Sequence, residues 1–402
     1  MIIHFWELPE KRTYVTINNK LKDNLFRNIS SRPLIRRLKG DKLPISFIKD
    51  ISKLTGISLG IFEKNISWIG GRNSNGVSTP HLPFNFGTRA GARFVAAITN
   101  DGSLCKDGKE SYGRLLYDNF DKTLRDSVMH DYLEIFGGKS AEVSFRTYTK
   151  KKYFEFASVI RDVVFLILKE KGSKAESNLA LPSFILNDPR LMCGWIEQTI
   201  ADEGEVKYEP SKYRRSIVWR RSLDVSSLFF KAPAKEIPFG ELPINLQTAL
   251  RGKVCKLIES EKQILNFLGI SFNLYNLGIY STVKGKVRTR WQISITKRLN
   301  LLKLRKLIKI PSYVKDQKFN RICNEFQRFK EPLRVKKAVE DLGKTHTIIT
   351  SIDLQKKMNY KLSNTALVWL KKFEKEDVVK KVRDSQYGNG HYRRPAEYIL
   401  RN

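Results

Sequence analysis

Two carboxylates, Asp101 and Glu203, hold equivalent places in a short pattern that the chain contains twice. The copies cover residues 94–103 and 196–205, and in each an apolar run ends in an acidic residue followed at once by glycine. Such a run predicts a helix, and a glycine after its last residue can take a positive φ and end it. Two such helix ends side by side would form a paired-carboxylate site for Mg²⁺ or another divalent cation, because hard cations prefer carboxylate oxygen.

The spacing of the copies predicts two similar halves. Glu203 follows Asp101 by 102 residues, about the size of a small domain. Periodicity and turn residues predict the same order in each half: helix, two strands, helix, two strands, helix. After the first copy we expect strands near 103–105 and 114–118, a helix over 122–136, strands over 141–149 and 153–158, and a helix over 159–169. After the second we expect strands near 205–208 and 216–224, a helix over 253–268, strands over 271–282 and 287–296, and a helix over 299–308.

Both copies resemble the LAGLIDADG motif of homing endonucleases. The resemblance implies an α+β fold with a duplicated αββαββα saddle, formed by residues 89–185 and 186–325, in which the two motif helices pack together. It also implies that Asp101 and Glu203 are catalytic residues and Mg²⁺ ligands, each serving the hydrolysis of one DNA strand. The expected protein is a free-standing, intron-encoded double-strand DNA endonuclease that acts as a monomer.

The copies also depart from the family pattern. The third motif position, where close helix packing favours a small residue, is Ala96 in the first copy but Gln198 in the second. Asn100 and Asp202 replace small residues at another position. The acidic sixth position of the family is Thr99 in one half and Ala201 in the other. The family's basic residue near the scissile phosphate has the candidates Lys171, Lys174, Lys315 and Lys318.

Composition points to a polyanionic partner. The 402 residues include 74 Lys+Arg against 41 Asp+Glu, a net charge of +33, and the first candidate for such a surface is nucleic acid. No apolar stretch reaches the roughly 18 residues of a spanning helix, so no membrane partner is expected. The four cysteines are far apart in sequence and indicate neither a zinc site nor disulfides, which favours a reducing, cytoplasmic location beside DNA. The five histidines receive no metal role.

The strands of the two halves carry the predicted DNA contacts. Along residues 287–294, apolar positions alternate with Arg288, Arg290 and Gln292, as in a sheet with one covered and one open face. Arginine and glutamine on an open face can contact phosphates and base edges, although each of them could also be an ordinary solvated residue. The full predicted set in the core is Arg146, Lys207, Arg214, Arg215, Arg220, Arg288, Arg290 and Gln292.

Two flanking units are expected to extend the DNA contacts. Residues 1–88 predict a helical unit that ends in a linker or loop over 70–88. Its pair of helices around Gly56 resembles a helix-turn-helix. The alternative is a helical pair that only packs on the core. Residues 330–402 predict a winged helix, in which the helix over 363–372 enters the major groove and Arg393 and Arg394 of the wing touch phosphate. The alternative for this unit is protein binding.

The leading interpretation is therefore a site-specific, Mg²⁺-dependent DNA endonuclease. One alternative is a catalytically inactive DNA-binding transcriptional regulator that keeps the same fold. Another is a maturase-like intron-splicing cofactor that binds RNA. Retention of both carboxylates favours the nuclease, whereas Gln198 and the two added binding units favour the regulator.

Overall fold

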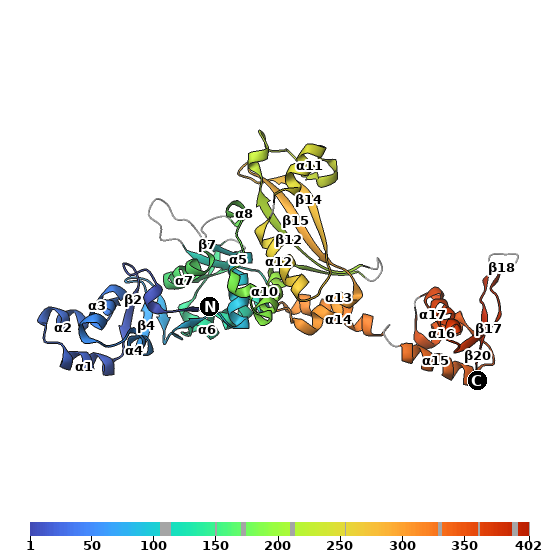
Figure 1. Ribbon diagram of the computed structural model, residues 1–402, viewed down its shortest axis with the longest axis horizontal. Coiled ribbons are helices and arrows are strands. Elements are labelled where there is room, and N and C mark those ends of the chain that lie inside the picture. Colours follow the sequence, from blue (N-terminus) through green and yellow to red (C-terminus); the bar gives the residue numbers. More distant parts are fainter. Residues whose placement is uncertain are drawn as a thin grey trace. The chain divides into compact units, whose positions relative to one another are not determined.

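The computed structural model describes residues 1–104, 114–148, 151–169, 174–209, 214–253, 255–328, 332–360, 362–387 and 393–401. The chain forms two compact units, Met1–Cys323 and Asn324–Asn402 (Figure 1). Each unit contains helices and small antiparallel sheets, which confirms the predicted α+β class. The domain boundaries predicted at 88/89, 185/186 and 330 stay predictions. Among the described helices, none is both long and apolar enough to cross a membrane.

The two motif copies form helices α5 (Arg89–Asn100) and α10 (Pro189–Asp202), which pack against each other in the first unit (Figure 1). Asp101 and Glu203 are their C-cap residues. The predicted reason for the glycines is wrong, because neither Gly102 nor Gly204 has a positive φ. A Cβ on Gly102 would instead lie 2.5 Å from the Cα of Ile98, and one on Gly204 would lie 2.5 Å from the carbonyl oxygen of Ile200. The chain turns back against the last helical turn too closely for any side chain.

The first half has the predicted order of elements and a four-stranded antiparallel sheet. Its strands and helices after α5 are β7 (Gly102–Leu104), β8 (Leu115–Asp118), α6 (Lys122–Phe136), β9 (Ser144–Tyr148), β10 (Lys151–Phe156) and α7 (Ser158–Leu168). The sheet order is β7-β8-β10-β9. One face packs on α5 and α6 through an aromatic cluster that includes Phe94, Tyr132 and Phe156. The other face carries Arg146 and Glu155, whose side chains pair at 2.8 Å.

The second half repeats this order with an insertion. After α10 come β11 (Glu205–Glu209), β12 (Arg214–Asp224), β13 (Ile237–Pro238), α11 (Ile244–Arg251), α12 (Lys256–Phe267), β14 (Asn273–Ser281), β15 (Val287–Ile295) and α13 (Arg298–Leu307). The sheet order is β11-β12-β15-β14-β13. The strand β13 and the helix α11 lie in the long connection before α12. Helix α14 (Tyr313–Arg328) follows the second half.

The N-terminal segment is more than the predicted helical unit. It contains the helices α1 (Asn19–Asn28), α2 (Arg32–Leu38), α3 (Ile45–Thr55) and α4 (Leu59–Lys64). It also contains the strands β1 (Ile2–Ile3), β2 (Tyr14–Ile17), β3 (Leu43–Pro44), β4 (Ile66–Gly70), β5 (Gly76–Ser78) and β6 (Phe84–Asn85). Helices α3 and α4 do meet at Gly56, whose φ is +70°.

The segment over 70–88, predicted as a linker or loop, also contributes two short strands. β5 extends the sheet β3-β2-β4-β5, and β6 pairs with β1. The glycines that indicated a linker serve close packing in this sheet. A Cβ on Gly76 would lie 2.4 Å from the carbonyl oxygen of Ile69 and 2.4 Å from the ring of Trp68. Glycine within a strand often marks such a close approach.

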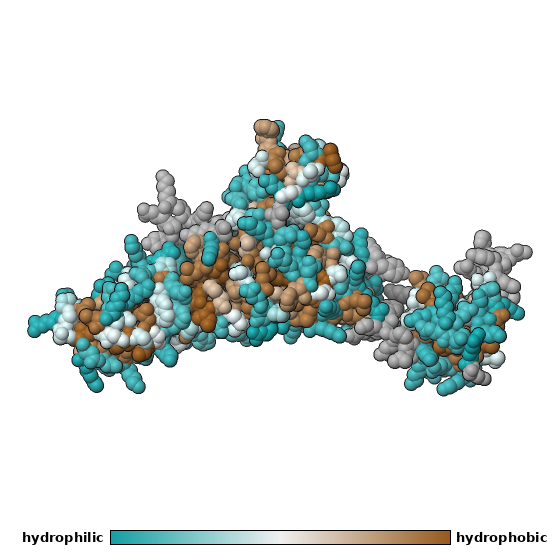
Figure 2. Space-filling model, in the orientation of Figure 1, coloured by the Kyte–Doolittle hydropathy of each residue, from teal (hydrophilic) through white to brown (hydrophobic). Residues whose placement is uncertain are grey.

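The second unit has a small core of its own. Its elements are α15 (Pro332–Thr345), β16 (Ile349–Thr350), α16 (Ser351–Met358), α17 (Ser363–Lys375), β17 (Val379–Arg383), β18 (Gln386–Tyr387), β19 (Arg393–Arg394) and β20 (Glu397–Leu400). The sheet β16-β20-β17 covers the helices, and the core includes Val339, Leu354, Leu370 and Tyr398. Hydrophilic side chains cover much of the face of this unit that Figure 2 shows.

Candidate functional site

Polar side chains meet where α5 and α10 end. Asn100, the last residue of α5, donates a hydrogen bond of 3.2 Å to Asp202, the last residue of α10. The same carboxylate accepts a bond of 2.9 Å from the Tyr117 hydroxyl and two bonds of 3.1 Å from the Gln198 side chain. The Gln198 amide nitrogen thus donates to a carboxylate of its own helix, one turn further on, at a position where the family pattern has a small residue.

The environment of Asp202 disfavours its charge. Burial and the neighbouring Asp101 carboxylate raise the pKa of Asp202 well above its usual range, although the donors from Gln198, Tyr117 and Asn100 act in the opposite direction. Burial and the same two carboxylates also raise the pKa of Tyr117. A proton can therefore be held at the end of α10, next to the first motif carboxylate.

Lys315 of α14 closes the end of α10. Its ammonium donates to the carbonyl oxygen of Ala201 at 2.5 Å and lies 3.3 Å from that of Ile200. A cation at a helix C-terminus is stabilised by the helix dipole. Burial lowers the pKa of Lys315, while Asp202 and Asp101 act to raise it. Of the four lysines predicted for the basic role, Lys315 is the one placed beside a motif carboxylate.

None of the other three lysine candidates is seen beside a motif carboxylate in the described part of the chain. Lys318 is exposed on α14, and Lys171 lies outside the described residues. Lys174 begins the short helix α8 (Lys174–Ser177), and its side chain is outside the described set.

The Asp101 end forms an acidic cavity of about 400 Å³. Its described charged residues are Asp101, Asp118, Asp121, Asp202 and Lys315. Asp101 accepts a hydrogen bond of 2.7 Å from the Asn119 amide, which orients one carboxylate oxygen. Mg²⁺ is commonly held by one or two carboxylates together with phosphate oxygen and water. The donor set at this end therefore fits a divalent cation.

The Glu203 end has the opposite character. It borders a cavity of about 570 Å³ whose other described charged residues are Arg220, Arg221, Arg288 and Arg290. The Glu203 carboxylate lies 3.7 Å from the Arg221 guanidinium. Arg221 and Arg290 also pair with Glu261 and Glu236, but positive charge remains in excess, which favours a phosphate over a metal ion. The two motif carboxylates are thus placed in unlike surroundings, although their positions in the sequence pattern are equivalent.

A buried network holds Arg221 in place. The Glu261 carboxylate of α12 is fully buried, pairs with Arg221 at 2.5 Å and accepts a bond of 2.8 Å from the Trp219 indole. The Trp195 indole of α10 lies 3.4 Å from the same carboxylate. Glu261 and Glu203 both raise the pKa of Arg221 against the effect of burial. This network was not predicted from the sequence. Its signals are a glutamate within the apolar pattern over 253–268 and an arginine at a core position of β12.

A second network joins the first turns of α5 to the middle of α10. The buried Glu197 of α10 accepts bonds of 2.6 and 2.9 Å from Arg89 of α5 and lies 3.6 Å from Arg93. It also accepts a bond of 2.7 Å from the backbone N–H of Lys309. The helices approach closely beside it, since a Cβ on Gly194 would lie 2.7 Å from the carbonyl oxygen of Arg89.

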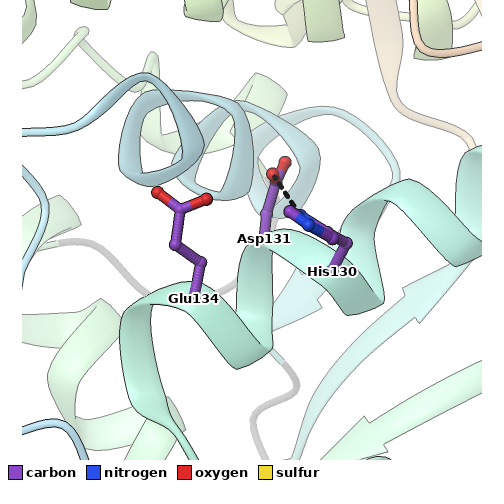
Figure 3. A group of neighbouring side chains, drawn as sticks. All are labelled: His130, Asp131 and Glu134. Carbon is purple, nitrogen blue, oxygen red and sulfur yellow. Dashed lines mark ion pairs between the residues drawn. The ribbon is translucent and has the colours of Figure 1, made fainter.

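A group on α6 has the composition of a metal site. Ligand atoms of His130, Asp131 and Glu134 lie within 4.8 Å of one another (Figure 3). Both oxygens of Asp131, however, accept hydrogen bonds from Arg93. A fully buried carboxylate already paired with a guanidinium has little charge to offer a cation, so this group fits a structural ion pair better than a metal site.

The register of β12 and β15 places the predicted DNA contacts. Arg220 lies opposite Gln292, and its guanidinium donates to the Gln292 side chain at 3.0 Å. Arg288 and Arg290 share that face, and Val287, Thr289 and Ile293 are buried on the other. Strand alternation puts Arg214 on the face of Arg220.

Arg215 does not share that face. It lies opposite Tyr208, and consecutive strand residues point to opposite sides, so it shares the covered face with Ile217 and Trp219. The predicted grouping of Arg214 and Arg215 on one open face is wrong for this reason. Lys207 is on the open face, 3.4 Å from Glu205, and Arg146 of the first sheet lies 2.8 Å from Glu155. Arg393 and Arg394 form β19, and their side chains are outside the described set.

Comparison with known proteins adds little to this geometry. No family model and no curated protein matches the sequence. Among solved structures, the chain is similar to one described as "The homing endonuclease I-WcaI bound to its DNA recognition sequence", with 12% sequence identity and a TM-score of 0.29. The match covers 57% of this chain and 85% of that one. A likeness of this size carries no weight for the activity.

Proposed function

We propose that the protein is a DNA endonuclease of the LAGLIDADG type that depends on a divalent cation. The observation that carries the proposal is that Asp101 and Glu203 end two helices that pack together, one from each of two halves with the same order of elements. The halves correspond to the saddle of that family, and the second unit to a winged helix with α17 as its groove-binding helix. One chain supplies both halves, so the active form is a monomer.

Asp101 is the carboxylate best suited to hold the cation. Asn119 orients it, Asp202 lies beside it, and Asp118 and Asp121 add negative charge to the same cavity. A bound Mg²⁺ would supply an activated water and stabilise charge on the scissile phosphate. Lys315 lines the same cavity, and its ammonium, held by the carbonyl oxygens of Ile200 and Ala201, would place a positive charge near a phosphate bound there. At the other motif end, the arginines of the cavity would bind the phosphate of the second strand, and Glu203 would be the carboxylate that holds a cation there.

The open faces of the two sheets would contact the duplex. Arg288, Arg290 and the Arg220–Gln292 pair lie on the second sheet, and Arg146 on the first. Guanidinium and amide groups on one face suit phosphates and the edges of guanine and adenine.

One observation favours a second candidate, a non-catalytic DNA-binding regulator. Glu203 lies beside the buried Arg221, and an ion pair reduces the charge available for a metal ligand. Such a protein would use the same sheet faces and bind DNA selectively without cutting it.

Cleavage of a randomised duplex library in Mg²⁺ separates the two candidates. The wild type is compared with Asp101→Asn, Glu203→Gln and the control Asp126→Asn, which changes an exposed aspartate of α6 in the same way. We expect double-strand cuts at one sequence, lost with EDTA and in both site variants while binding is retained, and unchanged in the control. Selective binding without cuts in Mg²⁺ or Mn²⁺ would replace the nuclease by the regulator.

A further inference from the structure

A basic cavity of about 720 Å³ lies between the N-terminal segment and the first sheet. Its walls come from the start of β2, the turn between β4 and β5, the strands β9 and β10, and the beginning of α7. The positively charged residues among its described lining are Lys11, Arg12, Arg72, Arg114, Arg146 and Arg161. All of these belong to the first compact unit.

Two carboxylates balance only part of this charge. Glu155 lies 2.8 Å from Arg146 and 3.5 Å from Arg114. Asp162 lies 2.9 Å from Arg12 and 2.8 Å from Arg161. Each carboxylate is therefore shared by two arginines. The described lining keeps an excess of four positive charges, which calls for an anion from outside the protein.

Lys11 and Arg72 are the residues whose unpaired positive charge is accessible to a ligand. Both side chains are exposed, and within the described residues neither forms an ion pair with a carboxylate. Gly71 and Ser74 bring the turn before β5 against α7, where the Ser74 and Ser158 hydroxyls are 3.0 Å apart. Helix α7 begins at this point, and its N-cap Ala157 has no side chain that could accept from the first N–H groups. The helix end adds to the positive potential.

The cavity continues the open face of the first sheet. Arg146 lies opposite Tyr153 in the β9–β10 ladder, and Glu155 lies two residues further along β10 on the same face. Arg146 thus belongs both to the predicted DNA-binding face and to the cavity. A single inorganic phosphate would fill only a small part of the space, whereas a nucleic-acid strand presents several phosphates in a row.

We infer that this cavity is a phosphate-binding site for the flank of the bound duplex, beyond the segment that the two sheets cover. The inference rests on the proposed binding of DNA but does not depend on cleavage. It makes the N-terminal segment a part of the DNA-binding surface through its β2 and β4–β5 loops, and not through the helix pair around Gly56.

The test uses the duplex sequence that the protein cuts or binds in the randomised library. It combines a hydroxyl-radical footprint on this duplex with the salt dependence of the dissociation constant. The cavity variant is Lys11→Glu/Arg72→Glu. The control is Lys20→Glu/Lys53→Glu, which makes the same charge change at exposed sites of α1 and α3 that do not line the cavity. We expect the cavity variant to lose protection at one end of the footprint and to lower the slope of log Kd against log salt by about 2, since each lost phosphate contact contributes about 0.9.

Each outcome has a definite meaning. A cavity variant whose footprint and slope equal those of the control would overturn the inference and leave the proposed DNA binding intact. A shortened footprint with cleavage retained at the same site would support it. A wild type that protects no duplex at all would overturn both the inference and the proposed function.

Discussion

Asn100 and Asp202, which hold the same position in the two motif copies, hydrogen bond to each other across the helix interface at 3.2 Å. The family pattern has small residues at this position, so both residues are departures from that pattern. In the structure the two residues are partners, because the Asn100 amide donates a hydrogen bond to the Asp202 carboxylate. Two departures that look independent in the sequence are thus one interaction.

Replacement of Asn100 tests this interaction. Asn100→Ala removes one hydrogen bond, and we expect the free energy of unfolding to fall by about 1 kcal/mol. Asn100→Asp places a further carboxylate beside Asp202 and Asp101, so we expect a larger loss at pH 8 that shrinks toward pH 4 as the carboxyl groups take up protons. Urea unfolding followed by circular dichroism measures both. Equal stability of the two variants at pH 8 would contradict the prediction.

The raised pKa of Asp202 predicts how stability changes with pH. Between the ordinary value of 3.8 and the raised pKa, the folded protein holds a proton that the unfolded chain has lost. The contribution of this group to the free energy of unfolding therefore falls as pH rises through that range and is constant above it. Asp202→Asn should remove this fall. The free energy of unfolding is measured against pH for the wild type, for Asp202→Asn and for the exposed control Asp126→Asn. Parallel curves for all three would contradict the prediction.

Because α5 and α10 approach closely, replacing a glycine by alanine should lower the stability of the protein at their contact but not at an open helical position. A Cβ at Gly194 would lie 2.7 Å from the carbonyl oxygen of Arg89, whereas one at Gly60 of α4 meets nothing nearer than the Ser58 hydroxyl at 4.0 Å. We expect Gly194→Ala to cost about 1–3 kcal/mol through overpacking and Gly60→Ala to stabilise by about 0.5 kcal/mol. Thermal and urea unfolding compare them. A gain in stability at both sites would mean that the helices are not tightly packed.

The buried network behind Glu203 predicts that the stability of the protein depends on the Arg221–Glu261 ion pair. Arg221→Met leaves the Glu261 carboxylate buried without its cation, so we expect a loss of about 3–5 kcal/mol. The double variant Arg221→Met/Glu261→Gln removes the charge and keeps an acceptor for the Trp219 indole, and it should recover most of that loss. If the double variant is no more stable than the single one, the cost lies in packing and not in charge.

The sequence predicts the skeleton of the site better than its chemistry. Apolar runs ending at glycine locate α5, α10 and α6, because helix periodicity and helix ends are local signals. The unlike surroundings of Asp101 and Glu203 depend on Lys315, Arg221 and Glu261, which are brought together by tertiary packing. No local pattern indicates that a charged residue within an apolar face will find a buried partner.

The sequence contains signals against two of the predictions, the shared face of Arg214 and Arg215 and the purely helical N-terminal segment. Arg214 and Arg215 are consecutive in a strand and cannot share a face, so one of them had to lie on the covered side. In the N-terminal segment, the apolar run Ile66–Gly70 is long enough for a strand. The strands around it have two to four residues, which is too short for alternation to be visible.

The pairing of Arg89 and Arg93 with Glu197 also bears on which assemblies the halves can form. The position of Glu197 in the first copy is Val95, so a first half has no acidic residue there to offer another first half. In a symmetric dimer of two first halves, the Arg89 guanidinium would lack the Glu197 carboxylate that it pairs with in this chain, whereas Arg93 would keep its partner Asp131. In a dimer of two second halves, the buried Glu197 carboxylate would likewise lack Arg89. We therefore expect separately produced halves to assemble as a mixed pair in preference to two copies of the same half.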